Sequence, residues 1–510
     1  MTDAPDQTPD PDDERFDSDE PFDARFDARE ALDALGLSDD DASTPEVVGG
    51  DATDRDDDEF DPEARDAADA VYAALLERVG EGAPRPRLEP TRRAVELLGD
   101  PHRSAPVIHL TGTNGKTSTS RMIESLLRAS GLRTGLLTSP HLERFTERIR
   151  IDGESIRDEA LARNWEEIEP FIAIVDAELE GSGESPLTFF EAFTVLAFAC
   201  FADAPVDVMV LEVGMGGEWD STNVADGQVA VITPIDLDHQ SRLGKDVVEI
   251  ARTKSGIIKP SAAVVSARQR DEVLKVLENA ADLTESTLAV EDDAFAVIST
   301  TVAVGGQLVS IRGLAGSYHD LALPLFGSHQ AQNAAVAVAA VEAFIGSGSV
   351  RLADEVVEVG LGTVTSPGRL QIVGSGPTVI VDAAHNPHGA RSLVASIRES
   401  FDFEELVVVL GVLGDKDASG IVDVLAGLDA QFIVTTPESD RATDADQLAG
   451  IVAAKVGADR VTVIDGVDDA LDEARDWAGD GDRRAVIVTG SVVLVGDAIR
   501  IAADRGWSAR

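Results

Sequence analysis

The stretch HLTGTNGKTSTSRMIE, residues 109–124, joins an apolar run to an amphipathic segment through two glycines. Before it, APVIHLTG (105–112) has the apolar character of a buried strand. After it, residues 116–131 carry apolar side chains at helical spacing, and Gly131 supplies a stop signal. A strand, a glycine loop and a helix in this order present backbone N–H groups and a helix N-terminus to phosphate oxygens. The stretch predicts a nucleotide-phosphate site in an α/β domain.

Each polar side chain of this loop has a predicted task. Lys116 would reach the β- and γ-phosphates, and the Thr117 hydroxyl would face Mg²⁺. Leu110 takes the place of the first glycine in the pattern G-x-x-x-x-G-K-[ST], so an ordinary glycine turn before a helix is the alternative. The predicted nucleotide-binding residues are Gly112, Thr113, Asn114, Gly115, Lys116 and Thr117.

Apolar β-rich runs alternate with amphipathic stretches along most of the chain. The alternation stops at the turn-rich segment GTVTSPGR (362–369) and then restarts with TVIVDAAHNPHGA. Two blocks of this kind indicate two α/β domains with largely parallel sheets. We place the first domain at residues 63–365 and the second at residues 366–510.

Residues 1–62 differ from the rest, because Asp, Pro, Thr and Glu dominate and apolar residues are scattered. Such a composition cannot bury enough surface to offset chain entropy, so we expect a disordered acidic arm. An acidic interaction arm is the alternative function for it.

The bulk composition excludes several classes of partner. The chain has 510 residues, a formal net charge of -51 and 43% apolar residues, with no long apolar run and no basic leader. We therefore expect no membrane span, no nucleic acid and no anionic membrane partner. The single Cys200 cannot form an internal disulfide, which fits a reducing, cytoplasmic compartment. Acid spread along the whole chain, with little lysine, is typical of a halophilic protein, whose stability should rise with KCl.

A nucleotide needs a metal, and Glu212 ends the apolar strand-like run VMVLE (208–212). A carboxylate at this place can meet Mg²⁺ beside a phosphate loop, although an ordinary surface carboxylate is equally compatible with the position alone. Other sequence motifs occur in a fixed order along the chain, and they decide between a metal ligand and an ordinary surface carboxylate. They are TSPHLERFTERIRIDG, LTFFEAFTVLAF, LEVGMGGEWDSTNV, LDHQSRLG, IARTKSGIIK, SPGRLQIV and DAAHNPHGA.

Together these phrases resemble the folylpolyglutamate synthase/dihydrofolate synthase branch of the Mur ligase superfamily, over roughly residues 64–510. The resemblance implies an N-terminal P-loop ATPase domain and a C-terminal Rossmann-like glutamate-ligase domain. It implies that MgATP phosphorylates a carboxylate to an acyl phosphate, which the amino group of L-glutamate attacks to give an amide. Two Mg²⁺ sites and a cytoplasmic monomer are part of the same expectation.

The resemblance also assigns roles to single residues. Lys254 matches a lysine that CO₂ carbamoylates, and carbamoylation requires an amine able to lose its proton. His239 matches a ligand of the second metal, although imidazole is a poor match for Mg²⁺. The implied metal ligands are Thr117, Ser139, Glu212 and His239. The implied nucleotide contacts outside the loop are Asn333, Arg369 and Asp382. The residues implied in catalysis are Lys116, Lys254, His385 and Ser491.

The resemblance also implies which residues bind the pterin part of the substrate. The segment TFFE resembles a pterin contact, and a phenylalanine there could stack on the ring, but a helix core explains it equally well. After GMGG the family has an arginine where this chain has Glu218 and then Trp219. A cation beside an anionic substrate is therefore lost, and Trp219 offers a stacking surface in its place. The implied substrate-binding residues are Thr188, Phe189, Phe190, Glu191 and Asp220.

Two other functions stay open at this point. Another Mur-type ligase, acting on a different carboxylate, is disfavoured because residues 1–62 cannot form a UDP-sugar-binding domain. A regulator that binds nucleotide without chemistry is disfavoured because Lys116, Glu212, Lys254 and His385 are all present. Whether the first glutamate is added to dihydropteroate, further glutamates to folates, or both, the sequence leaves undecided.

Overall fold

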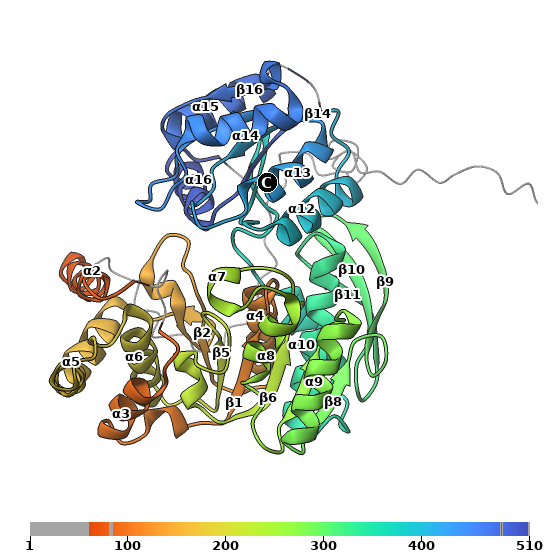
Figure 1. Cartoon of the computed structure of the whole chain (residues 1–510). Coiled ribbons are helices and arrows are strands. Elements are labelled where there is room, and N and C mark those ends of the chain that lie inside the picture. Colours follow the sequence, from red (N-terminus) through yellow and green to blue (C-terminus); the bar gives the residue numbers. More distant parts are fainter. Residues whose placement is uncertain (1–60, 81–84, 480, 482, 508–510) are drawn as a thin grey trace, which may run out of the picture. The chain divides into compact units, whose positions relative to one another are not determined.

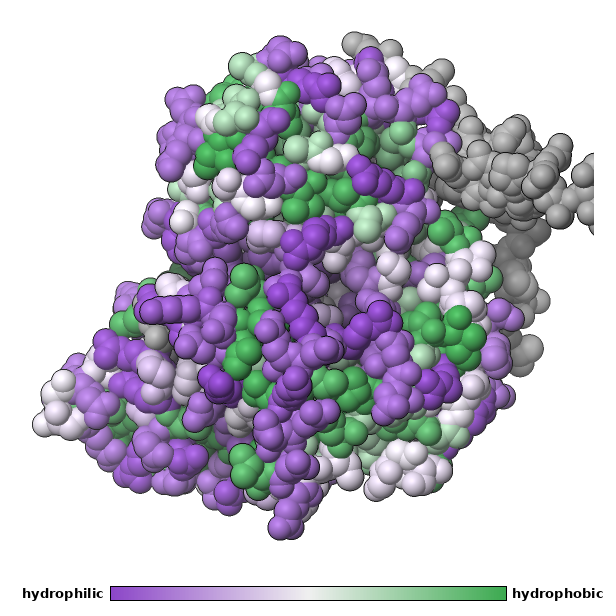
Figure 2. Space-filling view, turned by 45° about the vertical axis from the view of Figure 1, so that its right-hand side comes forward, coloured by the Kyte–Doolittle hydropathy of each residue, from purple (hydrophilic) through white to green (hydrophobic). Residues whose placement is uncertain are grey.

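The computed structural model describes residues 61–80, 85–479, 481 and 483–507. All but the last two residues of the expected acidic arm therefore lie outside the described part. Within that part, helix α2 begins at Pro62, where Asp61 caps it. No described helix is long and apolar enough to cross a membrane. Hydrophilic side chains cover most of the face seen in Figure 2, as the acidic composition leads one to expect.

The N-terminal domain is built on an eight-stranded sheet with the order β4-β3-β2-β5-β1-β6-β7-β8 (Figure 1). β1 lies between β5 and β6 and is parallel to both, so the strand that enters the glycine loop is central in the sheet. Only β3 and β4, at one edge, run antiparallel to their neighbours. The strands are β1 Val107–Thr111, β2 Thr134–Leu137, β3 Ile149–Ile151, β4 Glu154–Ser155, β5 Val208–Glu212, β6 Gly227–Ile232, β7 Ala263–Ser266 and β8 Thr287–Val290.

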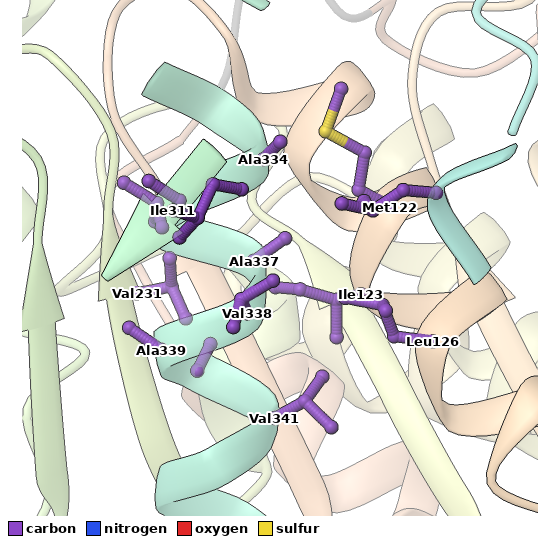
Figure 3. Packing of buried hydrophobic residues seen from close by; sticks show 14 of the residues in the cluster. Met122, Ile123, Leu126, Val231, Ile311, Ala334, Ala337, Val338, Ala339 and Val341 are labelled. Carbon is purple, nitrogen blue, oxygen red and sulfur yellow. The ribbon is translucent and has the colours of Figure 1, made fainter. Parts of the chain in front are cut away.

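Helices cover both faces of this sheet because successive strand residues point to opposite sides. On one face, Ile108 and Leu110 of β1 pack in a cluster with α4 and α10. Figure 3 shows Met122, Ile123 and Leu126 of α4 beside the small residues of α10. The other face carries α2, α3, α5 and α6. These helices are α2 Pro62–Leu76, α3 Glu89–Leu97, α4 Lys116–Ala129, α5 Asp158–Ser182, α6 Phe189–Asp203, α7 Gln240–Leu243, α8 Val247–Ser255, α9 Asp271–Leu283, α10 Ser328–Gly346 and α11 Asp354–Gly362.

A small antiparallel sheet, with the order β11-β10-β9, was not expected from the sequence. Its strands are β9 Ala296–Ala303, β10 Gly306–Arg312 and β11 Ser317–Leu323. Val309 and Ile311 of β10 join the cluster that holds α4 and α10. The small sheet therefore extends the core behind the glycine loop.

The C-terminal domain is built on a six-stranded sheet with the order β12-β13-β17-β14-β15-β16, parallel except for β12. The predicted boundary at residue 366 falls between the end of α11 and the start of β12. α12, α13 and α14 cover one face, and α15 and α16 cover the other. The strands are β12 Gln371–Ser375, β13 Thr378–Asp382, β14 Glu405–Leu410, β15 Gln431–Val434, β16 Val461–Val463 and β17 Arg484–Thr489. The helices are α12 Pro387–Ser400, α13 Ala418–Leu425, α14 Ala445–Val456, α15 Val467–Gly479 and α16 Val492–Asp504.

Candidate active site

The glycine loop connects β1 to α4 and needs its two glycines for space as well as for backbone conformation. Gly112 has a φ of 154°, and a Cβ there would lie 1.8 Å from the Thr233 hydroxyl oxygen. Gly115 has a φ of 86°, and a Cβ there would lie 2.7 Å from Oδ1 of Asn333. Larger residues would push the loop away from β6 and α10. Asn333, a predicted nucleotide contact, is therefore packed directly against the loop.

Lys116 begins α4, and its ammonium folds back over the loop. Its Nζ lies 3.3 Å from the carbonyl oxygen of Gly112 and 3.4 Å from that of Thr113. Burial lowers the pKa of Lys116, and the nearby Glu212 carboxylate opposes this change. The ammonium thus lies where a phosphate bound by the loop would meet it.

Three of the four predicted metal ligands lie together at the end of β5. Glu212 is 1% exposed, and its Oε1 accepts a hydrogen bond of 2.9 Å from the Thr117 hydroxyl. The backbone N–H of Ser139 also donates to this carboxylate. Its other oxygen, Oε2, is buried and has no hydrogen-bond partner among the residues that the structure describes. Burial raises the pKa of Glu212.

These residues fit a hard divalent cation. An unpartnered buried carboxylate oxygen is costly unless something positive meets it, and Mg²⁺ prefers oxygen ligands. Over the described residues, however, no three His, Cys, Asp or Glu side chains come together as a complete metal cage. This is the usual arrangement for Mg²⁺, which takes few protein carboxylates and completes its coordination with water and substrate phosphate.

Lys254 lies on α8 and is buried, with 4% exposure. Its Nζ donates a hydrogen bond of 2.6 Å to the carbonyl oxygen of Gly112, so the side chain touches the glycine loop. Burial, aided by the charge of Lys116, lowers the pKa of Lys254 to about 7. A substantial fraction of this lysine is therefore neutral near pH 7, which is unusual for a lysine.

His239, the fourth predicted metal ligand, belongs to a different group of side chains. Its Nε2 lies 3.3 Å from Nζ of Lys416, and Lys416 pairs with Asp238 at 3.0 Å. His385 Nε2 lies 3.7 Å from the other oxygen of Asp238. Burial alone would raise the pKa of Asp238, but the nearby His385 ring and the Lys416 charge hold it below its usual range. Asp238 thus gathers both predicted histidines around one carboxylate.

Contacts between the two domains continue from this group. Asn386 donates 3.1 Å hydrogen bonds to Asp238 and to the loop residue Asn114. Farther along, Asp236 pairs with Arg391 of α12 at 3.1 Å. The sequence reasoning missed Asp236, Asp238, Asn386 and Lys416. Asp238 and Asn386 are the neighbours of predicted histidines in the motifs LDHQ and AHNP, so these motifs could have indicated them. Lys416 lies in none of the motifs quoted above.

Two predicted residues of the C-terminal domain are occupied with local structure. Asp382 ends β13, and its carboxylate accepts 2.9 Å hydrogen bonds from the backbone N–H groups of Leu370 and Ala384. Burial raises the pKa of Asp382. Ser491 is 1% exposed and caps α16, with its hydroxyl accepting from the N–H of Leu494 at 3.1 Å. Asp382 therefore shapes the loop that carries Arg369, and Ser491 holds a helix end.

The polar groups of the segment Thr188–Glu191 are likewise engaged in local contacts. Thr188 caps α6, and Glu191 completes a capping box with it. The Glu191 carboxylate also pairs with Arg87 through bonds of 2.8 and 2.9 Å. Phe189 is 2% exposed inside an aromatic cluster, whereas Phe190 is half-buried, and a Cβ on Gly214 would lie 2.5 Å from its ring. Of the two rings, Phe190 is the one that reaches the turn after β5.

Asp220 stabilises the turn that follows β5. Its carboxylate accepts 3.0 Å hydrogen bonds from the backbone N–H groups of Met215 and Thr222. The Thr222 hydroxyl lies 2.8 Å from Nε2 of the buried His109, in β1. This chain of contacts ties the turn to the strand that enters the glycine loop. Trp219 lies against the turn, 3.2 Å from where a Cβ on Gly216 would be.

A small cleft opens beside Thr117. Its lining comes from α4, from the segment after β2 and from the C-terminal domain, and it includes Thr117, Arg121, Pro140, Leu142, Pro367 and Arg369. Arg369 was predicted as a nucleotide contact, while Arg121 was not singled out. It follows Thr117 by four residues on a predicted helix, a spacing that places both on one face.

Comparison with known proteins agrees with these motifs. The Mur ligase middle domain matches residues 110–341, and the Mur ligase glutamate ligase domain matches residues 368–492. A dihydrofolate synthase/folylpolyglutamate synthase of Mycobacterium tuberculosis is 45% identical over 440 residues, which cover 81% of this chain and 90% of that protein. The chain belongs to the folylpolyglutamate synthase/dihydrofolate synthase family of Mur ligases. The resemblance inferred from the motifs, and the two-domain α/β fold it implied, are confirmed.

Solved structures of the family are similar over most of the chain. The folylpolyglutamate synthase of Mycobacterium tuberculosis complexed with ADP has a TM-score of 0.83 at 43% identity, covering 86% of this chain and 99% of that one. A bifunctional folylpolyglutamate synthase/dihydrofolate synthase with Mn, AMPPNP and L-glutamate bound has a TM-score of 0.72 at 30% identity, covering 86% and 98%. Family membership makes the chain an ATP-dependent C–N ligase that uses a divalent metal.

Proposed function

We propose that this ligase joins L-glutamate to the carboxylate of a folate-type substrate, dihydropteroate or a tetrahydrofolate, at the glycine loop. The observation that carries the assignment is the arrangement of Lys116, Thr117 and Glu212, with an unpartnered carboxylate oxygen, beside a cleft that both domains line. The relatives named above supply the substrate class, because they are folylpolyglutamate and dihydrofolate synthases.

The chemistry explains why such a site has phosphate-binding groups and needs no nucleophilic side chain. A carboxylate does not react with an amine at neutral pH, so ATP first transfers its γ-phosphoryl group to the carboxylate and ADP leaves. The glutamate amino group then attacks the acyl carbon of the acyl phosphate and loses a proton, and inorganic phosphate departs. Both steps develop anionic charge, which Lys116 and the N–H groups of the loop would stabilise.

The metal ligands follow from the same arrangement. The Thr117 and Ser139 side chains and the Glu212 carboxylate would hold a Mg²⁺ ion, which supplies charge neutralisation for the phosphates. A second metal near His239 stays a proposal. The pKa of His239 is lowered to about 4, mainly by burial, so its imidazole is neutral and able to ligate.

Lys254 is proposed to carry a carbamate. Its neutral amine would attack CO₂ and release one proton, which leaves a carbamate anion in place of an ammonium. The lowered pKa of Lys254 supports this step, because only the unprotonated amine reacts. The new anion would lie at the glycine loop, where the ammonium now bonds to Gly112.

We also propose roles for the remaining predicted residues. Asn333 and Arg369 would contact the nucleotide. His385 would act near the incoming amine, because its ring lies beside Asp238 at the junction of the domains. The contacts of Asn386 and Arg391 hold the C-terminal domain against the loop, and the closure they make would keep water from the acyl phosphate. We propose that the enzyme acts in the cytoplasm as a monomer.

The test is a ligation assay with purified protein in molar KCl. The protein is incubated with MgATP, [¹⁴C]glutamate and, in separate reactions, dihydropteroate or tetrahydrofolate. Label should appear in a folate product, and one inorganic phosphate should form for each amide. Phosphate release without labelled product, or no reaction with either acceptor, would contradict the assignment. The ratio of the two rates decides between the dihydrofolate synthase and folylpolyglutamate synthase activities.

A further inference from the structure

Arg121 is a cation of the cleft to which no role has been given. It lies on α4 one turn after Thr117, and both residues line the cleft. Residues four apart on a helix lie on the same face, about 5–6 Å apart at Cβ. Arg121 and Thr117 therefore lie on one face of α4 and line the same cleft.

Arg121 makes no hydrogen bond and no ion pair within the described part of the chain. Its Nε is buried and makes no hydrogen bond. Burial, with a contribution from Arg150, lowers the pKa of Arg121 to about 10, so the group remains charged at neutral pH. A desolvated charge without a partner is costly, and such groups are concentrated at functional sites.

The charges of Glu124, Glu147 and Glu212 raise the pKa of Arg121, but no ion pair joins any of the three to it within the described residues. Glu124 bonds to Arg128 and to the hydroxyl of Thr134. Glu147 accepts from the backbone N–H groups of three consecutive residues, Leu142 to Arg144. The Glu212 carboxylate accepts from Thr117, and among the described residues its other oxygen has no hydrogen-bond partner. An internal ion pair therefore does not account for Arg121.

The walls of the cleft indicate what kind of ligand would meet this cation. Pro140, Leu142 and Pro367 supply apolar surface, and Arg369 supplies a second guanidinium. Glu147 also lines the cleft, but backbone N–H groups bind its carboxylate. A ligand with an aliphatic stem and a carboxylate fits such a lining, because a guanidinium fork matches the two oxygens of a carboxylate. Phosphate has its own cation in Lys116 at the loop.

We propose that Arg121 binds a substrate carboxylate through its guanidinium and holds it beside Thr117. This inference rests on the proposed function and specifies one of its binding contacts. Two substrates carry the required group: the acceptor, whose carboxylate is activated, and the incoming glutamate. Arg121 on α4 would thus place one of them next to the phosphates bound at the start of the same helix.

The experiment compares Arg121→Gln and Arg121→Lys with the wild type. Arg128→Gln is the matched control, because Arg128 lies on the same helix, is partly exposed and pairs with Glu124. KM is measured for ATP, glutamate and the preferred acceptor. Equilibrium binding of [¹⁴C]glutamate, and separately of tetrahydrofolate and dihydropteroate, is measured with AMPPCP and Mg²⁺, which allows no turnover. Thermal unfolding shows whether each variant is folded.

Arg121→Gln should raise KM and Kd about tenfold or more for one of the two carboxylate substrates, because a charge-assisted bidentate contact is lost. A change for the acceptor or for glutamate identifies which carboxylate binds. Arg121→Lys should recover part of the loss, since it keeps the charge without the fork. The KM for ATP and all constants of Arg128→Gln should stay within about twofold.

Unchanged constants for both carboxylate substrates in a folded Arg121→Gln protein would overturn the inference. A rise confined to the KM for ATP, or a fall in kcat alone, would overturn it as well. If the wild type ligates neither acceptor, the proposed function fails, and the binding measurements with AMPPCP still decide whether Arg121 holds a carboxylate.

Discussion

The glycine loop and the segment Thr188–Glu191 were both assigned to substrates by motif, yet they use their polar groups differently. Around the loop, Glu212 keeps an unpartnered carboxylate oxygen, and Arg121 keeps an unpartnered Nε. In the second segment, Thr188 and Glu191 cap α6 and Glu191 pairs with Arg87. The loop region therefore keeps polar atoms available for the ligands we propose, whereas the polar groups of the second segment are engaged in local contacts.

The difference leads to opposite expectations for mutation. A residue that meets ligands should lower activity when changed and leave the fold intact, since few of its contacts are internal. A residue that caps or pairs internally should lower stability and leave the binding constants nearly unchanged. The following variants test this division.

Lys116→Ala should have the largest effect. The change removes the ammonium beside the carbonyl groups of Gly112 and Thr113, where it would face the β- and γ-phosphates. We expect kcat/KM for ATP to fall by about a thousandfold or more, as for other groups that stabilise transferred charge. Steady-state ligation measures it, and thermal unfolding in the same buffer should show an intact fold. Wild-type turnover in this variant would remove the glycine loop from the reaction.

Lys254→Ala should have the next largest effect, a loss of about a hundredfold in kcat, because the proposed carbamate supplies anionic oxygen at the loop. Binding of AMPPCP should persist. Added acetate or formate should restore part of the rate by replacing the missing carboxylate, whereas chloride at equal concentration should not. A fully active Lys254→Ala protein in CO₂-depleted buffer would refute the role.

Much of the fold was predictable from the sequence, because strand–loop–helix order leaves few arrangements for a parallel sheet. The segments 105–112 and 208–212 were predicted as strands, and each contains a strand of the structure. The small sheet β9–β11 was missed. Polar and apolar residues alternate irregularly in it, as in STTVAVGGQLVS (299–310), and its burial depends on contacts with distant helices.

The site was predictable only where a motif prescribes a backbone geometry. Thr117, Ser139 and Glu212 were expected together and lie together. Asp238 and Lys416 could not be found in this way, because their pairing joins positions 178 residues apart and depends on how the domains meet. Ser491 shows that a motif alone can leave the role of a residue undecided. Its place in a motif is compatible with a helix cap as well as with a ligand contact, and only coordinates reveal that its hydroxyl is occupied.

Lys254, which contacts the glycine loop, should make the stability of the protein depend on pH. The folded pKa of Lys254, about 7, is lower than that of an unfolded lysine. Between these values the unfolded chain binds more protons, so the stability contributed by this group is fully present at high pH and is lost as pH falls towards 7. Lys254→Met lacks this dependence. From pH 9.5 to pH 7.5 in CO₂-free buffer, the wild type should lose about 2 kcal/mol relative to Lys254→Met.

Chemical unfolding of both proteins at several pH values, at constant KCl, measures the difference. The matched control is Lys455→Met, because Lys455 pairs with Asp423 at the surface and is 40% exposed. Its difference from the wild type should not change with pH over this range. A wild type and a Lys254→Met variant that follow the same pH curve would show that Lys254 is an ordinary solvated lysine.

Thr188→Ala should have the smallest effect, and the effect should fall on stability. The Thr188 hydroxyl accepts the backbone N–H of Glu191, and the Glu191 carboxylate accepts the N–H of Thr188. Loss of an N-cap hydroxyl costs about 1 kcal/mol, and half of a capping box disappears with it. The KM for the acceptor should change by less than about twofold, because the hydroxyl is buried at the helix end and already bonded.

Unfolding curves and acceptor KM values for Thr188→Ala and Thr188→Ser decide the matter. Serine keeps the oxygen that caps α6, so Thr188→Ser should retain most of the stability that alanine loses. An acceptor KM that rises at least tenfold in Thr188→Ala, with the unfolding curve unchanged, would mean that the hydroxyl turns from the helix to the substrate when the substrate binds. Buried capping groups would then belong to the binding site, and the division between the loop and this segment would fail at Thr188.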